Sequence, residues 1–327
     1  MEKYGICVAG SLIADRFYEV DSYPKEGFLS TIRSSAMHIG GSGNLILDLA
    51  KLDKNLAVKV CAVVGEDQSG KELLNVLNGY ANIDTDDVVR EGESSVTLVM
   101  NANDTKQRTF FFVPGASDVF DETKIHWESI TSRIFHLEYL LLMKKVDADD
   151  PEYGTHGARI LAHAKAAGMI TSFDMVSEQS DRIKDVVSPA LKFTDICCIN
   201  ESEAQAITGI EVVSQETASQ ALKELHRLGV SKWVVIHSPK HNYGYDVTLD
   251  KIVCVDSLKL PEGYIKGTTG AGDAFCGGIL YGAHCGDTLE SSMNLAIACA
   301  ACSLSESNGT DGMRCREDVL SLFNMYR

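Results

Sequence analysis

The sequence predicts an α/β protein with a mainly parallel sheet, and two observations lead to this fold class. Short apolar runs rich in β-forming residues alternate with helical patterns from one end of the chain to the other, the order that βα units produce. Several of these runs end in a polar or acidic residue, which places those side chains at the carboxyl edge of the sheet, where such sheets bind ligands. No linker or internal repeat divides the 327 residues, so we expect one domain over residues 1–327.

The individual elements follow from the same periodicity. Buried strands are expected at Tyr4–Ala9, Val58–Val64, Arg133–Leu137, Met169–Asp174, Asp195–Ile199 and Trp233–His237. Helices are expected at Asn44–Leu52, Lys71–Asn78, Gly154–Ala167, Glu201–Thr208 and Glu216–Leu228. Two early segments, Phe17–Met37 and Ser94–Val113, alternate apolar and polar residues instead, which is typical of strands with one covered face. We expect these two segments to form a small β-strand lid that excludes water from a bound substrate.

Composition and charge exclude several classes of function. The formal net charge of −16 argues against nucleic-acid or anionic membrane partners, which require clustered Lys and Arg. The apolar N-terminal run is too short for a secretory signal, and no run approaches a membrane span. The ten cysteines lack the spacing of a zinc site or a disulfide framework. We therefore expect a cytoplasmic protein with reduced cysteines and no metal bound through sulfur.

Two glycine motifs suggest nucleotide-binding loops and are rejected. The stretch from Gly65 to Lys71 has the G-x-x-x-x-G-K spacing of a P-loop, but Glu72 stands where Ser or Thr must hold magnesium. The pair Gly41 and Gly43 begins a dinucleotide fingerprint whose third glycine position is Ile46. Neither a P-loop nucleotidase nor a dehydrogenase is supported.

The stretch KGTTGAGDAFCGG, from Lys266 to Gly278, has two readings. In one, the glycines form a loop and Asp273 caps the helix that follows. In the other, the backbone amides before a helix over residues 274–284 bind an anion such as a phosphate. A carboxylate beside that phosphate would then act as general base for an alcohol nucleophile. The residues alone favour neither of these two interpretations.

This stretch resembles the D-T-x-G-A-G-D signature of the ribokinase/PfkB family of carbohydrate kinases, and four further blocks lie in the family's order. They are Gly10–Asp15, Gly40–Asn44, Val64–Gly70 and Asn200–Glu203. The resemblance covers nearly the whole chain. It implies a ribokinase-like three-layer α/β/α sandwich with a small lid. It also implies that Asp273 is the catalytic base and that Gly270, Ala271 and Gly272 form the anion hole.

The resemblance further implies a sugar site. An aspartate binds a diol by accepting two hydrogen bonds, and glycines allow a sugar to approach the backbone. An arginine in the lid and a glutamate after the strand RIFHL are added as candidate substrate contacts. The predicted substrate-binding residues are Asp15, Gly40, Gly41, Asn44, Arg108 and Glu138.

For the nucleotide side, Asn200 and Glu203 match an N-x-x-E motif that in the family organises magnesium and its waters, as suits a hard cation. The alternative for this pair is helix capping. The turn HSPKHN departs from the family's T-x-G-x-x-G, and Ser238 is its candidate hydroxyl donor. Gly267 replaces the signature's leading aspartate, a region that helps many members to hold a monovalent cation, so potassium activation is in doubt.

We therefore expect an ATP- and magnesium-dependent kinase for a hydroxyl of a sugar or sugar-like molecule. A nucleoside kinase of the same fold is an alternative. A second alternative is a binding protein that has lost the chemistry, which the altered HSPKHN turn favours and the retained Asp273 opposes. The alternating apolar faces of the lid strands also suggest a homodimer through the lid.

Overall fold

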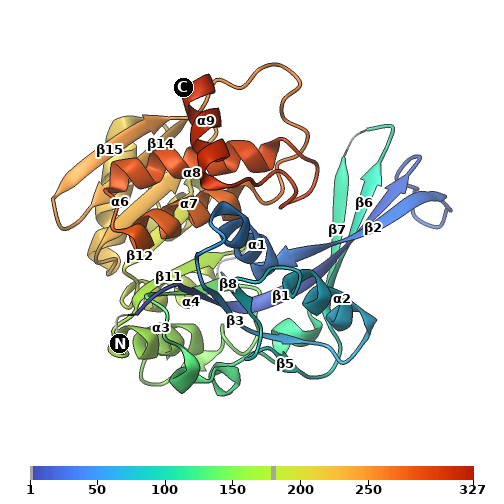
Figure 1. Ribbon diagram of the computed structural model, residues 1–327, viewed down its shortest axis with the longest axis horizontal. Coiled ribbons are helices and arrows are strands. Elements are labelled where there is room, and N and C mark those ends of the chain that lie inside the picture. The colour runs from blue at the N-terminus through green and yellow to red at the C-terminus, as the bar shows by residue number, and fades with distance from the viewer. Residues whose placement is uncertain (1–2, 106, 178–181) are drawn as a thin grey trace.

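The computed structural model describes residues 3–105, 107–177 and 182–327; residue 106, within the second predicted lid segment, lies outside them. Its central sheet has the strand order β15-β14-β13-β12-β11-β8-β1-β3-β4, with β5 pairing beside β3 (Figure 1). The neighbouring pairs from β12–β13 to β3–β4 are parallel, and β13–β14 and β14–β15 are antiparallel. The strands are β1 (Ile6–Val20), β3 (Val58–Val64), β4 (Ile83–Asp84), β5 (Val89–Arg90), β8 (Ile134–Leu140), β11 (Ile170–Met175), β12 (Ile196–Asn200), β13 (Trp233–His237), β14 (His241–Asp246) and β15 (Lys251–Asp256).

Helices cover both faces of this sheet. One core contains side chains of α1 (Ser42–Leu52), α2 (Gln68–Leu77), α7 (Ala271–Cys285), α8 (Leu289–Leu304) and α9 (Arg316–Tyr326). The other contains side chains of α3 (His156–Ala166), α4 (Ile183–Leu191), α5 (Glu201–Thr208) and α6 (Gln215–Leu228). Strand β1 alternates between them, since Ile6 and Val8 enter the first core and Cys7 and Ala9 the second. The predicted three-layer α/β/α sandwich is confirmed.

Short elements complete the second face. Three 3-10 helices follow the lid, and a two-stranded ribbon precedes α3. They are η1 (Gly115–Asp118), η2 (Glu122–Lys124), η3 (Trp127–Ser129), β9 (Asp149–Asp150) and β10 (Gly154–Thr155). Within the three described ranges, no helix combines the length and hydropathy needed to cross a membrane.

A second group of strands projects from the body and forms the lid (Figure 1). Beyond the body, β1 pairs with β2 (Ile32–Gly41) and β6 (Ser95–Ala102), and β6 pairs with β7 (Arg108–Val113). We call Ile13–Val20, β2, β6 and β7 the lid sheet. It contains strands from both predicted lid segments and extends beyond the first. Strand β1 does not end at Ala9, because Gly10 pairs with both β3 and β8 instead of starting a turn.

Candidate active site

Asp273 lies in the first turn of α7 and does not cap that helix. The N-cap is Gly270, and no side chain caps the helix start. The Asp273 carboxylate instead accepts two hydrogen bonds from other elements. The amide Nδ2 of Asn44, in α1, donates to Oδ2 at 2.9 Å, and the hydroxyl of Tyr139, in β8, donates to Oδ1 at 2.5 Å. The carboxylate is therefore held between α1, β8 and α7.

The first turn of α7 offers backbone amides to a ligand. In the described part of the chain, the amides of Gly272 and Asp273 donate no hydrogen bond to a backbone or side-chain acceptor. Gly270 has φ 79°, and a Cβ there would lie 2.5 Å from the Cα of Gly309, so only glycine fits. Free amides at the positive end of a helix dipole form a site suited to a phosphate.

Asp15 enters the site from the lid sheet. Gly40 lies beside it on β2, and a Cβ at Gly40 would lie 2.1 Å from Oδ2 of Asp15. Gly41 is the N-cap of α1, so the junction of β2 and α1 brings Asp15 and Asn44 to the same region. Burial raises the pKa of Asp15 to about 6, and the charge of Asp273 acts in the same direction, while a hydrogen bond from Thr97 opposes the rise.

Replacement of Asp15 by asparagine is expected to stabilise the fold at high pH only. The folded pKa of about 6 exceeds the ordinary 3.8, so the stabilising contribution of this carboxyl is fully present below about pH 4 and is lost as pH rises through about 6. Asparagine does not ionise. Urea unfolding should therefore show Asp15→Asn more stable than the parent by about 1–3 kcal/mol at pH 8 and nearly unchanged at pH 4. Equal differences at both pH values would contradict the burial of an ionised Asp15.

Further carboxylates surround Asp273. Glu138, 1% exposed near the end of β8, shares a hydrogen bond of 2.8 Å between its Oε2 and Nε2 of His136, and its Oε1 is buried without a partner in the described residues. Burial and the charge of Asp273 raise the pKa values of Glu138 and Asp48 well above their ordinary range. Burial lowers the pKa of His136 to about 3, so this imidazole is neutral. The site thus gathers carboxyl groups whose ionisation burial opposes, so a ligand that brings positive charge with it would favour their ionised forms.

Asn200 and Glu203 form the capping box of α5. The side-chain oxygen of Asn200 accepts from the backbone amide of Glu203 at 2.9 Å. Oε2 of Glu203 accepts from the backbone amide of Asn200 at 2.9 Å. Oε1 of Glu203 accepts from the Ser177 hydroxyl at 2.5 Å. Helix capping and magnesium binding, the two alternatives from the sequence, are therefore compatible, because a capping carboxylate can still bind a hydrated cation. Both oxygens already accept hydrogen bonds, so the pair fits magnesium through its waters.

Arg108 and Ser238 each contact a loop of the protein itself. From the lid, Arg108 donates to Oγ1 of Thr269 at 2.9 Å and to the carbonyl oxygen of Ser307 at 3.2 Å. The lid is therefore tied to the loop that precedes the anion hole. The Ser238 hydroxyl donates to the carbonyl oxygen of His241 at 2.8 Å and closes its own turn. Substrate or nucleotide contacts of either residue stay predictions.

Comparison with known proteins identifies the family. The profile described as pfkB family carbohydrate kinase matches residues 3–314. The chain belongs to the pfkB family of carbohydrate kinases. Relatives of this pfkB-family chain include ribokinase from Haemophilus influenzae, 22% identical over 321 residues that cover 96% of this chain and 97% of the relative. Ribokinase from Arabidopsis thaliana is 24% identical over 326 residues, 97% of this chain and 80% of the relative.

Solved structures share the fold. Arabidopsis thaliana ribokinase complexed with ribose and ATP superposes with a TM-score of 0.81 at 23% identity, over 98% of this chain and 99% of that one. Ribokinase from Thermotoga maritima gives a TM-score of 0.80 at 19% identity, with the same coverage. The ribokinase-like fold of the pfkB-family chain is thereby shown.

Sequence reasoning missed several residues of this pfkB-family site. Tyr139 contacts Asp273 directly, yet it follows Glu138 in an apolar run that gives no signal of a polar role. Asp174 lies near the end of β11. Burial raises the pKa of Asp174, and the charges of Glu203 and Glu138 raise it further. The acidic residue at the end of that predicted strand could have marked Asp174 as a site residue. His237 lies beside the anion hole, since a Cβ on Gly272 would be 3.8 Å from its Cε1.

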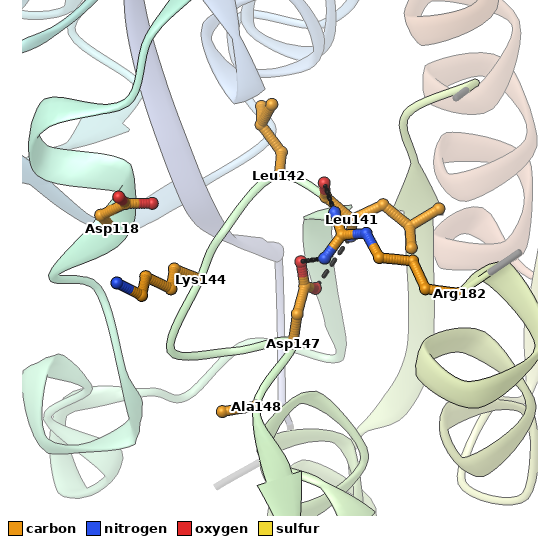
Figure 2. A pocket seen from close by; sticks show the side chains of 7 residues that line it. All are labelled: Asp118, Leu141, Leu142, Lys144, Asp147, Ala148 and Arg182. Carbon is orange, nitrogen blue, oxygen red and sulfur yellow. Dashed lines mark hydrogen bonds and ion pairs between the residues drawn. The ribbon is translucent and has the colours of Figure 1, made fainter. Parts of the chain in front are cut away.

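A cavity of about 350 Å³ lies just beyond β8 of the pfkB-family chain but is not the candidate site (Figure 2). Its lining comes from η1, the loop after β8 and the residue before α4, namely Asp118, Leu141, Leu142, Lys144, Asp147, Ala148 and Arg182. The guanidinium of Arg182 donates to the Leu141 carbonyl and pairs with Asp147. None of the predicted site residues lines this cavity. Leu141, which does line it, packs into the core on the face of the sheet opposite α7.

Proposed function

We propose that this chain is an ATP-dependent kinase that transfers a phosphoryl group to a hydroxyl of a sugar or sugar-like alcohol. The observation that carries this proposal is the convergence at the start of α7. A buried carboxylate, Asp273, adjoins two free backbone amides and receives a hydrogen bond from Asn44. Such a site combines a proton acceptor with a phosphate-binding element, the two groups that phosphoryl transfer to an alcohol requires.

The roles of the chain's own residues follow from this arrangement. Asp273 accepts the proton of the attacking hydroxyl, while the free amides of Gly272 and Asp273 stabilise charge on the transferred phosphoryl group. The Ala271 amide instead donates to the carbonyl oxygen of Thr268 at 3.4 Å. Asp15 accepts hydrogen bonds from the acceptor's hydroxyls, with Asn44, Gly40 and Gly41 beside it. Because the hydroxyl proton leaves late in a loose transition state, an ionised aspartate is a sufficient base.

Magnesium would be held through water by Glu203 beside Asn200, with Asp174 nearby. When bound with the nucleotide, it neutralises phosphate charge. The fit rests on the buried carboxyl groups of Asp174 and Glu203, which no side-chain cation contacts in the described residues. For a monovalent cation the chain offers less, since Gly267 has no carboxylate and a Cβ there would lie 3.0 Å from the carbonyl oxygens of Glu306 and Ser307.

The test is ADP release from ATP and magnesium with a panel of acceptors. Ribose and fructose enter the panel first because relatives are called ribokinase and fructokinase, followed by other sugars and by nucleosides. Turnover with a sugar supports the proposal. Turnover with nucleosides alone would replace it by a nucleoside kinase, and tight binding without turnover of any acceptor would favour a binding protein. Running the panel in potassium and in choline buffers addresses the monovalent cation.

We also propose a homodimer formed through the lid. Large apolar side chains are exposed on and beside the lid strands, including Phe28 at 75% and Leu29 at 89%, together with Ile32, Phe110 and Phe111. Several large exposed apolar side chains on and beside the same strands are typical of an interaction surface. Sedimentation velocity should show a dimer that Phe111→Glu converts to monomer. The control Leu249→Glu, an exposed apolar position remote from the lid strands, should stay dimeric. A monomeric parent would contradict the proposal.

Residues 1–327 are proposed to act as one kinase domain with the lid sheet as its cover. We propose a cytoplasmic location, where the ten free thiols would stay reduced.

A further inference from the structure

Burial makes the ionised form of Asp273 costly, and titratable groups lie around it. Charged or titratable side chains face it from every neighbouring element: Asp15 from β1, Asp48 from α1, His136 and Glu138 from β8, Asp174 from β11 and Glu203 from α5. Five of these are carboxyls, and the histidine is neutral. In the described residues, no lysine or arginine pairs with Asp273. A buried carboxylate in such surroundings tends to take up a proton and would then be useless as a base.

Two neutral donors oppose this tendency. Asn44 reaches Oδ2 from α1, and Tyr139 reaches Oδ1 from β8 with the shorter distance, 2.5 Å against 2.9 Å. Burial raises the pKa of Tyr139 well above its ordinary range, and the charges of Asp273 and Glu138 add to the rise, so the phenol keeps its proton and donates. Burial raises the pKa of Asp273, and the hydrogen bond from Tyr139 is the largest effect that opposes the rise, followed by that from Asn44.

The two donors also fix the direction of the carboxylate. They come from two different elements, α1 and β8, and hold one oxygen each, so the Asp273 side chain cannot rotate without breaking a hydrogen bond. Each oxygen retains a second lone pair that can accept from an incoming hydroxyl. The acceptor can therefore approach only along the lone pairs that Tyr139 and Asn44 leave open.

We propose that Tyr139 is a positioning residue for phosphoryl transfer, whose hydrogen bond to Oδ1 of Asp273 holds that carboxylate in place and sets the side from which the acceptor hydroxyl is deprotonated. The inference rests on the proposed function. In the step itself, the acceptor oxygen bonds to the γ-phosphorus, the bond from that phosphorus to the ADP oxygen breaks, and the hydroxyl proton passes to Asp273. Tyr139 keeps its own proton throughout.

The test compares Tyr139→Phe with Tyr245→Phe. The control also removes a tyrosine-to-aspartate hydrogen bond, because Tyr245 donates to Oδ1 of Asp250 at 2.8 Å on β14, away from the site. Titration of aspartate side-chain carboxyls by 13C NMR, with Asp273→Asn to assign the signal, should show the pKa of Asp273 higher by about one pH unit in Tyr139→Phe and unchanged in Tyr245→Phe. An unchanged Asp273 titration in Tyr139→Phe overturns the inference.

Kinetics provide the second readout. In Tyr139→Phe, the acid limb of kcat should move to higher pH by the same amount, and kcat at its plateau should fall about tenfold to a hundredfold with little change in KM. A rise in KM alone would show that Tyr139 merely shapes the acceptor site and would overturn the positioning role. If the parent turns over no acceptor, the proposed function fails, whereas the NMR titration still decides whether Tyr139 controls Asp273.

A second variant covers the case in which Tyr139→Phe does not fold. Difluorotyrosine placed at position 139 keeps the ring and the hydroxyl but is a stronger hydrogen-bond donor, so it should lower the pKa of Asp273. A shift in the other direction, or none, contradicts the proposal.

Discussion

The variant Asp273→Asn is expected to fold like the parent and to lose turnover, with kcat reduced by about 10²–10⁴-fold. Asparagine has nearly the same shape and still offers an oxygen to the Tyr139 hydroxyl, and its NH2 group can donate to Asn44 once the Asn44 amide turns its own oxygen toward it. It cannot accept the proton of the acceptor. The change also removes a buried charge from a group of carboxyls, so the melting temperature should not fall. Single-turnover ADP release with the best acceptor measures the chemical step directly.

The matched control for this variant is Asp250→Asn, which makes the same replacement at another aspartate that accepts from a tyrosine. It should keep the parent's kcat. Near-normal turnover of Asp273→Asn would remove Asp273 from the role of base. A large fall in melting temperature would instead show that the carboxylate holds the fold together.

Gly270→Ala should damage both the fold and the activity, because it combines backbone strain with a collision. Gly270 has φ 79°, and the added Cβ would lie 2.5 Å from Gly309 Cα and 2.6 Å from Gly309 O. Backbone atoms cannot move aside as the end of a side chain can. We expect the free energy of unfolding to fall by about 2–4 kcal/mol and kcat to fall at least about 10²-fold, because the amides that bind phosphate are displaced.

Gly286→Ala separates the two causes. Gly286 caps the other end of α7 with φ 78°, but no atom lies within 4 Å of an added Cβ. This control carries the strain without the collision, and we expect it to lose about 1–2 kcal/mol with no change in kcat. Urea unfolding and ADP release on both variants measure the difference. Similar losses in the two variants would show that Gly309 gives way and that the close approach has no role.

The fold was predictable to a large extent, because the spacing of apolar residues along the sequence indicates which side chains are buried. The six predicted strands and the five helices predicted between them exist, since β runs covered on both faces and amphipathic helices leave strong patterns. Helix α4 was not predicted. The exact course of β1 was not predictable. Its continuation from Ala9 to Val20 depends on pairing with β2 and β6, and such long-range partners leave no local signal. Strands β14 and β15 were also missed, although each pairs with a strand adjacent to it in the sequence.

The site was predictable where a motif marked it and not where packing created it. Asp273, Asn44 and Asp15 belong to ordered motif blocks, and the structure brings them together from α7, α1 and β1. Tyr139 carries no motif, and its contact with Asp273 spans 134 residues of sequence. Its role depends on where the end of β8 lies relative to the start of α7, which only the tertiary structure fixes. Asp48, one turn after Asn44 on a buried helix, was hidden in the same way.

The course of β1 has a consequence for how the site is assembled. Its first half pairs with β3 and β8 in the body, whereas Asp15 lies in the half that pairs with β2 and β6. Asp273 belongs to the body. The residue that would hold the acceptor and the residue that would deprotonate it thus stand on two different parts of the molecule, joined by one unbroken strand and by the hydrogen bonds of Arg108. Twisting of that strand would separate them, so the alignment of acceptor and base depends on the position of the lid.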